Sequence, residues 1–402
     1  MDSPIDGSTS VPVFNLLYDH KNSRDSAVQL AQACDPIFRK ETGTIKSSQF
    51  TDGITNTLMK VTLEDPSRSK SENDRAAIVL RIYGQGTDTL IDRAQEIKTH
   101  ELLASKDLAP PLLARFGNGI IYRFCPGDVC SAEDLRRPEV YREVARTLGK
   151  WHRSLPVSAI SSDVHNDEAA QSAPHPNIWT VLKQWIDMLP CDELEEVEQR
   201  RRLQEELFWI VSTFAKLPAF TGQTYVFSHA DLLSGNIILE RGSSERRDSE
   251  CARRATFIDY EYAIPAPSAF DIANHFSEWA GFDCDYSRCP TRAQRLAFLH
   301  SYLDSCRAQQ VSRKKSDQST ESGFEPPLQK LFQQVDLFRG IPGLFWGVWS
   351  LHQDAISSHS FDYKSYAKVR LDEYWSWKAE FDGSREREGR KKGAREMRWA
   401  QE

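Results

Sequence analysis

The sequence predicts an α+β fold of two lobes, a small antiparallel sheet followed by a larger, mainly helical lobe. The order of the patterns is the first reason: strand-like alternation and short apolar runs occupy residues 50–124, and helical periodicity dominates after Gly127. Length is the second reason, since 402 residues with 40% hydrophobic content suffice to build two cores. We expect a polar N-terminal extension over 1–35, a first lobe over 36–126, a second lobe over 127–380 and a charged tail over 381–402.

Four segments build the first lobe in order. Residues 49–63 combine a Gly-containing turn with alternating apolar residues, and 76–84 form a short apolar run that ends at Gly84. Residues 88–108 carry apolar side chains at helical spacing. Residues 112–127 predict a hairpin whose tight turn is Gly117-Asn118-Gly119.

Helices dominate the second lobe. The sequence SAED at 131–134 is a capping box that precedes a helix over 139–155. Further helices are expected over 177–189, 192–216, 268–280, 291–306 and most of 325–378. The segments 241–254 and 307–323 and the tail after 382 are charged and poor in apolar residues, so we expect solvated surface there.

Composition excludes several classes of protein. A formal net charge of −7 provides no basic surface for nucleic acid. No apolar run approaches the roughly 18–20 residues of a membrane span, and the N-terminus lacks a signal pattern, so we expect a cytoplasmic protein. The eight cysteines include no C-x-x-C pair and no zinc spacing, which favours reduced thiols.

Two polar clusters lie inside apolar strands. His229, Asp231 and Asn236 have the spacing H-x-D-x-x-x-x-N, and Asp259 ends the next apolar run. This spacing is typical of the catalytic loop in a protein-kinase-like fold, in which the aspartate meets the attacking hydroxyl. We therefore predict a kinase with Asp231 as the catalytic residue and with Asn236 and Asp259 as Mg²⁺ ligands, because Mg²⁺ prefers hard oxygen atoms. His229 is expected to be structural at this site.

The first lobe should bind ATP. Arg81 lies in an apolar strand, where its guanidinium could pair with phosphate oxygens, and Glu96 on the following helix is its expected ion-pair partner. Thr55 and Asn56 belong to a loop that could cover the phosphates. We do not expect a protein substrate. The chain has neither the H-R-D and D-F-G strings of protein kinases nor their glycine-rich loop. The acceptor should be a small molecule.

Four strings taken together resemble the choline/ethanolamine kinases: HADLLSGN, IDYEYA, FDIANHFSEWAGFD and LFWGVWSLHQDAISSHSFDYKSYAKVR. The resemblance covers roughly residues 35–380. It implies a kinase-like fold, ATP and Mg²⁺ as cofactors, and an amino alcohol as the phosphate acceptor in phospholipid synthesis. It also implies that the ammonium group binds in a pocket of the following residues: Tyr262, Glu278, Trp346, Trp349 and Tyr366.

Physical chemistry supports such a pocket for an ammonium group. Aromatic faces attract a cation by about 0.5–2 kcal/mol each, and a carboxylate adds Coulomb attraction. Spacing alone favours a core aromatic stripe for Trp346 and Trp349, whereas the resemblance favours the pocket. Leu232-Leu233 and the segment 278–291 are more similar to ethanolamine-type members, which implies an ethanolamine kinase.

Three other functions compete with this one. Choline kinase, or a dual-specificity enzyme, is the nearest alternative, and an aminoglycoside phosphotransferase shares the loop. A non-catalytic pseudokinase predicts loss of Asp231, Asn236 or Asp259, and all three are present. The sequence leaves open whether the chain forms a homodimer. One departure from the family is Ala230 in place of its usual Asn, which removes a potential loop hydrogen bond of about 1 kcal/mol.

Overall fold

The computed structural model describes residues 11–40, 43–50, 56–84, 91–159, 173–214, 217, 224–240, 254–313, 326–357 and 361–402. The chain divides into two compact units, Met1–Asp128 and Val129–Glu402. Within the described residues, no helix combines the length and apolar character needed to cross a membrane. The polar segments 241–253 and 314–325 lie outside the described residues.

A six-stranded sheet is the centre of the first unit. Its strand order is β1-β5-β6-β4-β3-β2, antiparallel throughout except for the parallel pair β1–β5. The elements of this unit are β1 (Val13–Phe14), α1 (Ser23–Cys34), β2 (Thr44–Gln49), β3 (Thr57–Glu64), α2 (Lys70–Ala76), β4 (Ile78–Ile82), α3 (Arg93–Ser105), β5 (Leu112–Phe116) and β6 (Gly119–Arg123).

The predicted hairpin is formed by β5 and β6, and a glycine in it brings two strands close. A Cβ on Gly119 would lie 2.2 Å from the main-chain oxygen of Arg81, so only glycine permits this approach of β6 to β4. The glycine thereby helps to fix the strand that carries Arg81.

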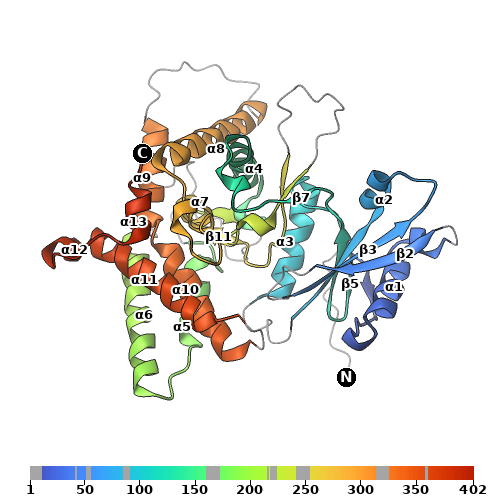
Figure 1. Ribbon diagram of the computed structural model, residues 1–402, viewed down its shortest axis with the longest axis horizontal. Coiled ribbons are helices and arrows are strands. Elements are labelled where there is room, and N and C mark those ends of the chain that lie inside the picture. Colours follow the sequence, from blue (N-terminus) through green and yellow to red (C-terminus); the bar gives the residue numbers. More distant parts are fainter. Residues whose placement is uncertain are drawn as a thin grey trace. The chain divides into compact units, whose positions relative to one another are not determined.

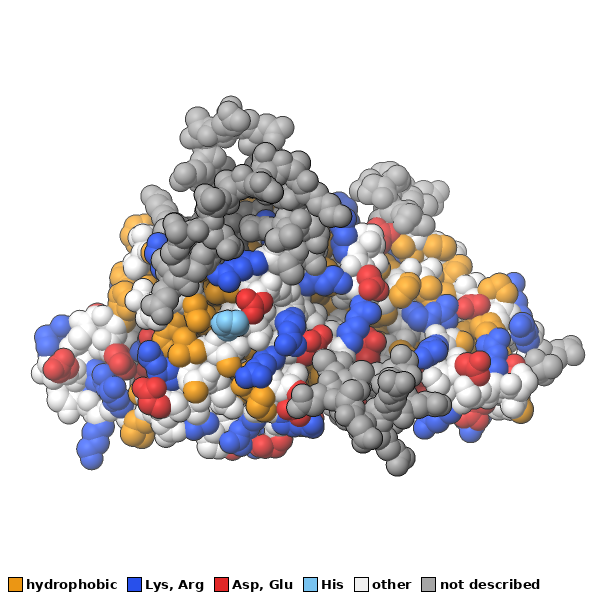
Figure 2. Space-filling view, turned by 90° about the horizontal axis from the view of Figure 1, so that it is seen from above, with side chains coloured by type: hydrophobic (Ala, Val, Ile, Leu, Met, Phe, Trp, Pro, Cys, Tyr) orange, Lys and Arg blue, Asp and Glu red, His pale blue; other side chains and the backbone are white. Residues whose placement is uncertain are grey.

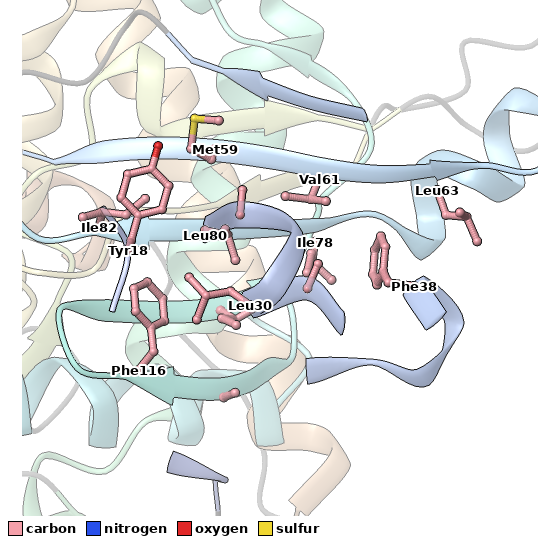
Figure 3. Packing of buried hydrophobic residues seen from close by; sticks show 14 residues of the cluster. Tyr18, Leu30, Phe38, Met59, Val61, Leu63, Ile78, Leu80, Ile82 and Phe116 are labelled. Carbon is pink, nitrogen blue, oxygen red and sulfur yellow. The ribbon is translucent and has the colours of Figure 1, made fainter. Parts of the chain in front are cut away.

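The N-terminal segment differs from the expected polar extension. Helix α1 buries Ala27, Leu30 and Ala31 in a core cluster that also contains residues of β3 and β4, and Figure 3 shows Leu30 among the labelled side chains of this core. These three residues lie at i, i+3 and i+4, which is the apolar stripe of a surface helix. Residues 23–34 therefore belong to the core of the first unit.

Helices form most of the second unit, with short strands around its loops. The strand β7 (Asp128–Val129) has only two residues and lies at the boundary between the units. Figure 1 shows α10 and α11 side by side. The remaining elements are α4 (Pro138–Ser154), α5 (Ile178–Asp187), α6 (Leu194–Phe214), β8 (Val226–Ser228), β9 (Ile237–Leu239), β10 (Ala255–Phe257), β11 (Ile264–Ala266), α7 (Ser268–Glu278), α8 (Arg292–Arg313), α9 (Pro326–Phe338), α10 (Ile341–Ile356), α11 (Tyr363–Phe381), α12 (Ser384–Arg387) and α13 (Ala394–Trp399).

The C-terminal segment also differs from the expected charged tail. Helix α13 buries Arg395, Glu396 and Trp399, each at most 5% exposed. The segment is rich in charge, yet those charges pair with residues of the second unit, which local sequence composition does not reveal. On the face drawn in Figure 2, Lys and Arg side chains lie among Asp and Glu side chains, in keeping with a modest net charge.

Candidate active site

The loop between β8 and β9 holds Asp231 and Asn236 against each other. Asn236 donates from Nδ2 to Oδ2 of Asp231 at 3.0 Å and to the main-chain oxygen of Asp231 at 2.8 Å. Both side chains are buried. Because the amide nitrogen is turned toward Asp231, the Oδ1 atom of Asn236 is the one that can bind a cation.

His229 ties this loop to the strand segment that precedes Asp259. Its Nδ1 accepts the N–H of Asp231 at 3.3 Å, and its Nε2 lies 3.1 Å from the main-chain oxygen of Ile258. Burial lowers the pKa of His229 to about 4, so the ring is neutral near pH 7. A neutral ring that accepts at Nδ1 carries its proton on Nε2 and donates it to Ile258, which is a structural role.

Asp259 follows β10 and lies close to the loop. The N–H of Ile258 donates to the main-chain oxygen of Asn236 at 3.0 Å, which joins the two segments. Asp259 has φ +65°, a left-handed conformation that Asp tolerates better than most residues. Burial, followed by the charges of Asp259, Glu278 and Glu261, raises the pKa of Asp231 well above its usual range.

The donor set fits Mg²⁺ better than a transition metal. It consists of one carboxylate, Asp259, and one amide oxygen, on Asn236, with a second carboxylate in Asp231 beside them. Mg²⁺ is usually held by one or two such oxygens together with phosphates and water. In the part of the chain that the structure describes, no cluster of three or more His, Cys, Asp or Glu side chains forms a self-sufficient metal cage.

Through Asp271, helix α7 holds the backbone of the loop that carries Asp231. Its carboxylate accepts the N–H of His229 at 2.9 Å and the N–H of Ala230 at 2.8 Å. The Nε2 atom of His152 lies 2.8 Å from the same carboxylate. Burial alone would raise the pKa of Asp271, but the bonds from His152 and from the loop lower it, so the group is ionised.

Two further side chains of α7 bind the loop carbonyls. Asn274 donates to the main-chain oxygen of Ala230 at 2.7 Å, and Nδ1 of His275 lies 2.8 Å from that of Leu232. Sequence reasoning missed Asp271, Asn274 and His275. Their signal was three polar residues at i, i+3 and i+4 among the apolar residues of a helix that, in the structure, is buried throughout.

Ala230 adopts a backbone conformation that disfavours alanine. Its φ is +62°, in the left-handed region where a residue with a Cβ costs roughly 1–2 kcal/mol and Asn is better tolerated. The substitution at this position therefore removes more than a side-chain hydrogen bond. The contacts from Asp271 and Asn274 offset the strain.

The predicted aromatic residues of α10 meet Tyr262. The rings of Trp346 and Trp349 have centroids 5.5 Å apart, and the Tyr262 ring lies 5.5 Å from Trp346 and 6.5 Å from Trp349. Each indole N–H is committed: Trp346 donates to Oδ1 of Asn274 and Trp349 to the hydroxyl of Tyr262, both at 2.8 Å. The rings are thus fixed in orientation by hydrogen bonds as well as by packing.

Tyr366 joins this group through α11. Tyr363, which sequence reasoning missed, has its ring 5.8 Å from that of Trp349, and Phe361 lies between Tyr363 and Tyr366 with centroid distances of 4.9 and 5.5 Å. Tyr363 precedes Tyr366 by three residues, so one helix face presents both.

Glu278 lies near the site but is not a lone carboxylate. Its Oε1 atom is 3.1 Å from Nη2 of Arg370, a fully buried guanidinium that the sequence analysis did not single out. Burial raises the pKa of Glu278, and the charge of Arg370 opposes that rise. The charge of Glu278 also contributes to the raised pKa of Asp231, so the two carboxylates are electrostatically coupled.

The nucleotide-site candidates belong to the first unit. Nη1 of Arg81 lies 3.4 Å from Oε1 of Glu96, and Oε2 of Glu96 accepts from Nη1 of Arg93 at 2.9 Å. The structure thus brings together Arg81 and Glu96 and adds Arg93, one turn earlier on α3. The Oδ1 atom of Asn56 lies 3.4 Å from the N–H of Gly84. Thr55 lies outside the described residues.

Known proteins are similar to this chain along most of its length. The family model for "Choline/ethanolamine kinase" matches residues 47–375. "Ethanolamine kinase 1" of Mus musculus is 31% identical over 387 residues, covering 93% of this chain and 95% of the mouse protein.

Solved structures of two kinases share the fold. The ethanolamine kinase of Plasmodium vivax has a TM-score of 0.66 at 24% identity, with 89% of each chain covered. The choline kinase of Cryptosporidium parvum has a TM-score of 0.65 at 20% identity, with 90% of this chain and 97% of that one covered.

Proposed function

Because the chain belongs to the choline/ethanolamine kinase family, we propose that it transfers the γ-phosphoryl group of ATP to the hydroxyl of ethanolamine, giving phosphoethanolamine and ADP. The observation that carries the proposal is the placing of Asp231. Its carboxylate lies 3.0 Å from the amide of Asn236 and is influenced by both Asp259 and Glu278. These contacts support Asp231 as a candidate catalytic group that interacts with both candidate metal ligands and with Glu278 of the candidate ammonium pocket.

Asp231 would orient the hydroxyl of the amino alcohol and accept its proton. The oxygen of that hydroxyl forms the new bond to the γ-phosphorus, and the bond from this phosphorus to the bridging oxygen of ADP breaks. The raised pKa of Asp231 suits a proton acceptor, since its proton affinity then lies nearer to that needed around neutral pH. Because the transition state is loose, fixing the acceptor in line matters more than strong basicity.

Asn236 and Asp259 would hold Mg²⁺ through oxygen atoms, and the bound ion would neutralise charge on the transferring phosphoryl group. In the first unit, Arg81 would contact phosphate oxygens while Glu96 keeps the guanidinium oriented. The aromatic rings of Tyr262, Trp346 and Trp349 would face the ammonium group.

Choline is the second candidate acceptor, and one observation favours it. Six aromatic residues make ring contacts in this part of the second unit, and such a box suits a trimethylammonium group. A primary ammonium carries three N–H donors and needs acceptors such as Glu278, whose charge Arg370 shares. The similarity to ethanolamine kinases supports ethanolamine as the principal substrate. A pseudokinase is disfavoured, because the catalytic and metal-ligand candidates are all present.

The test is steady-state phosphorylation by the purified protein with Mg-ATP. Ethanolamine, its mono- and dimethyl derivatives and choline are compared side by side. A kcat/KM at least about tenfold higher for ethanolamine, equal to about 1.4 kcal/mol, supports the proposal. A preference for choline replaces the substrate but keeps the reaction, and turnover of no amino alcohol overturns the proposal. A cytoplasmic location stays a prediction, to be checked by cell fractionation.

A further inference from the structure

The last helix of the chain, α13, is anchored inside the second unit. Trp399 donates from Nε1 to Oδ1 of Asp336 at 2.5 Å, and its main-chain oxygen accepts from Arg295 at 3.0 Å. Arg395, at the start of the helix, donates to the main-chain oxygen of Arg339 at 2.5 Å. These bonds hold the Arg395 side chain in a buried position, 4% exposed.

From Arg395, buried charges of alternating sign lead to the candidate ammonium pocket. Nε of Arg395 lies 3.9 Å from Oε2 of Glu373, and Nε of Arg370 lies 3.5 Å from the same oxygen. Nη2 of Arg370 then lies 3.1 Å from Oε1 of Glu278. The four side chains are between 0% and 6% exposed, and their formal charges sum to zero. We call these four residues the charge chain.

The neighbouring carboxylate Glu396 does not draw Arg395 away from the charge chain, because it is already paired with Arg339. Glu396 lies 3.6 Å from Nη1 of Arg395, but both Nε and Nη2 of Arg339 donate to Glu396 at 3.0 Å. Glu396 therefore has a cation of its own. Burial raises the pKa of Glu278, and the charges of Arg370 and, more weakly, Arg395 lower it, so the influence of α13 reaches the pocket.

We propose that Arg395 is a positioning residue for the amino alcohol: through Glu373 and Arg370 it sets the net charge that Glu278 presents to the cationic substrate. The inference rests on the proposed function, because it requires an ammonium group beside Glu278. Water screens these charges poorly at their buried positions, so a single added or removed charge changes the potential at the pocket.

The charge chain makes a prediction about sign. Arg395→Met removes one positive charge and leaves the four residues of the charge chain with a net charge of −1. It should lower the KM for ethanolamine by about three- to tenfold. Glu373→Gln removes one negative charge, leaves a net charge of +1 and should raise this KM by a similar factor. The double variant restores neutrality, and its KM should return close to that of the unaltered protein.

The experiment measures KM for ethanolamine and for Mg-ATP, with kcat, in these three variants of the full chain. A merely structural role would shift both single variants in the same direction and would make the double variant worse than either. Arg395→Lys keeps the charge and should leave the KM unchanged. Arg398→Met changes a charge on α13 outside the charge chain, since Arg398 donates to the main-chain oxygen of Cys289, and should also leave it unchanged.

Opposite shifts in the ethanolamine KM, with an unchanged KM for Mg-ATP, support the inference. Shifts of the same sign, or no shift, overturn it. If Glu373→Gln does not fold, the comparison of Arg395→Met with Arg395→Lys still decides, because only the former should lower the KM. Turnover of no amino alcohol by the unaltered protein overturns the proposed function and this inference with it, whereas normal turnover with unshifted KM values overturns the inference alone.

Discussion

The indole nitrogen of Trp346 donates a hydrogen bond to Asn274 at 2.8 Å, and the same Asn274 side chain donates to the main-chain oxygen of Ala230 at 2.7 Å. One buried amide therefore joins a ring of the candidate ammonium pocket to the residue that precedes Asp231, the candidate catalytic aspartate. Trp349 has no such connection, because its indole donates to the Tyr262 hydroxyl. The two tryptophans should differ in what their loss does.

Trp346→Phe should lower kcat, whereas Trp349→Phe should change chiefly the KM for the amino alcohol. Each variant keeps an aromatic ring and removes one donor, so the pair is matched. Trp346→Phe leaves the buried Oδ1 of Asn274 without its donor, at a cost of about 1–3 kcal/mol, and loosens the loop that carries Asp231. Steady-state kinetics of the two variants measures the difference. Equal kcat values would contradict a link from Trp346 through Asn274 to the loop that carries Asp231.

Asp271→Asn should destabilise the protein by about 2–4 kcal/mol and reduce kcat. The carboxylate accepts from His229, Ala230 and His152, and an amide cannot accept all three bonds while turning a donor toward one of them. Denaturant unfolding measures the loss. The exposed Asp283, which pairs with Arg288 at the surface, provides the control, because Asp283→Asn should change stability by less than about 0.5 kcal/mol.

Asp231→Asn should reduce kcat by about a hundredfold or more while nucleotide binding is retained. The substitution keeps the shape of the side chain and removes its capacity to accept the hydroxyl proton. Asp259→Ala should instead weaken Mg²⁺-dependent nucleotide binding. Kinetics and equilibrium binding of nucleotide with and without Mg²⁺ separate these outcomes, and wild-type turnover by Asp231→Asn would remove Asp231 from the mechanism.

Stability should fall as the pH is lowered from about 6.5 toward 4. Burial lowers the pKa values of His100, His229 and His275 to about 4, below the roughly 6.5 of an unfolded histidine. In this window the unfolded chain binds more protons than the folded one, so each histidine removes about 1.4 kcal/mol per pH unit from the free energy of unfolding. Unfolding curves across pH measure the slope.

A variant tests the assignment of that slope. His275→Asn keeps a donor for the main-chain oxygen of Leu232 and removes one titrating group, so the slope should decrease by about one proton. An unchanged slope would mean that other groups dominate the acid side.

Trp399→Ala should destabilise the protein by about 3–5 kcal/mol, whereas Met397→Ala should have an effect below about 0.5 kcal/mol. Both residues lie on α13, but Trp399 is 5% exposed and Met397 is 54% exposed. A differential scanning measurement on the two variants compares them directly. Equal melting temperatures for the two variants would indicate that the C-terminal segment is a solvated tail.

Much of the fold could be predicted because its signals are local. The hairpin of β5 and β6 follows from a turn motif between apolar runs, and the H-x-D-x-x-x-x-N loop follows from spacing alone. Even the pair of Arg81 with Glu96 was predictable, since a strand cation and the next helix meet in this fold.

What could not be predicted depends on pairing between distant residues. Nothing local to Glu278 indicates that Arg370 neutralises it in part, and nothing local to 394–399 indicates that its charges meet partners on α11 and near α9. Charged composition predicts solvation only when the charges lack buried partners. For α7, the polar residues were visible in the sequence, but their targets are main-chain atoms of a loop about 40 residues earlier.

Ala230 has a backbone conformation that its own side chain disfavours, and three side chains of α7 hold the loop around it. The loop that carries Asp231 consequently lacks the contacts that hold its geometry in a nascent chain that ends before residue 268. Catalytic competence should arise late and all at once during folding, when α7 docks. Enzymatic activity would then report on completion of the second unit more stringently than its helical content does.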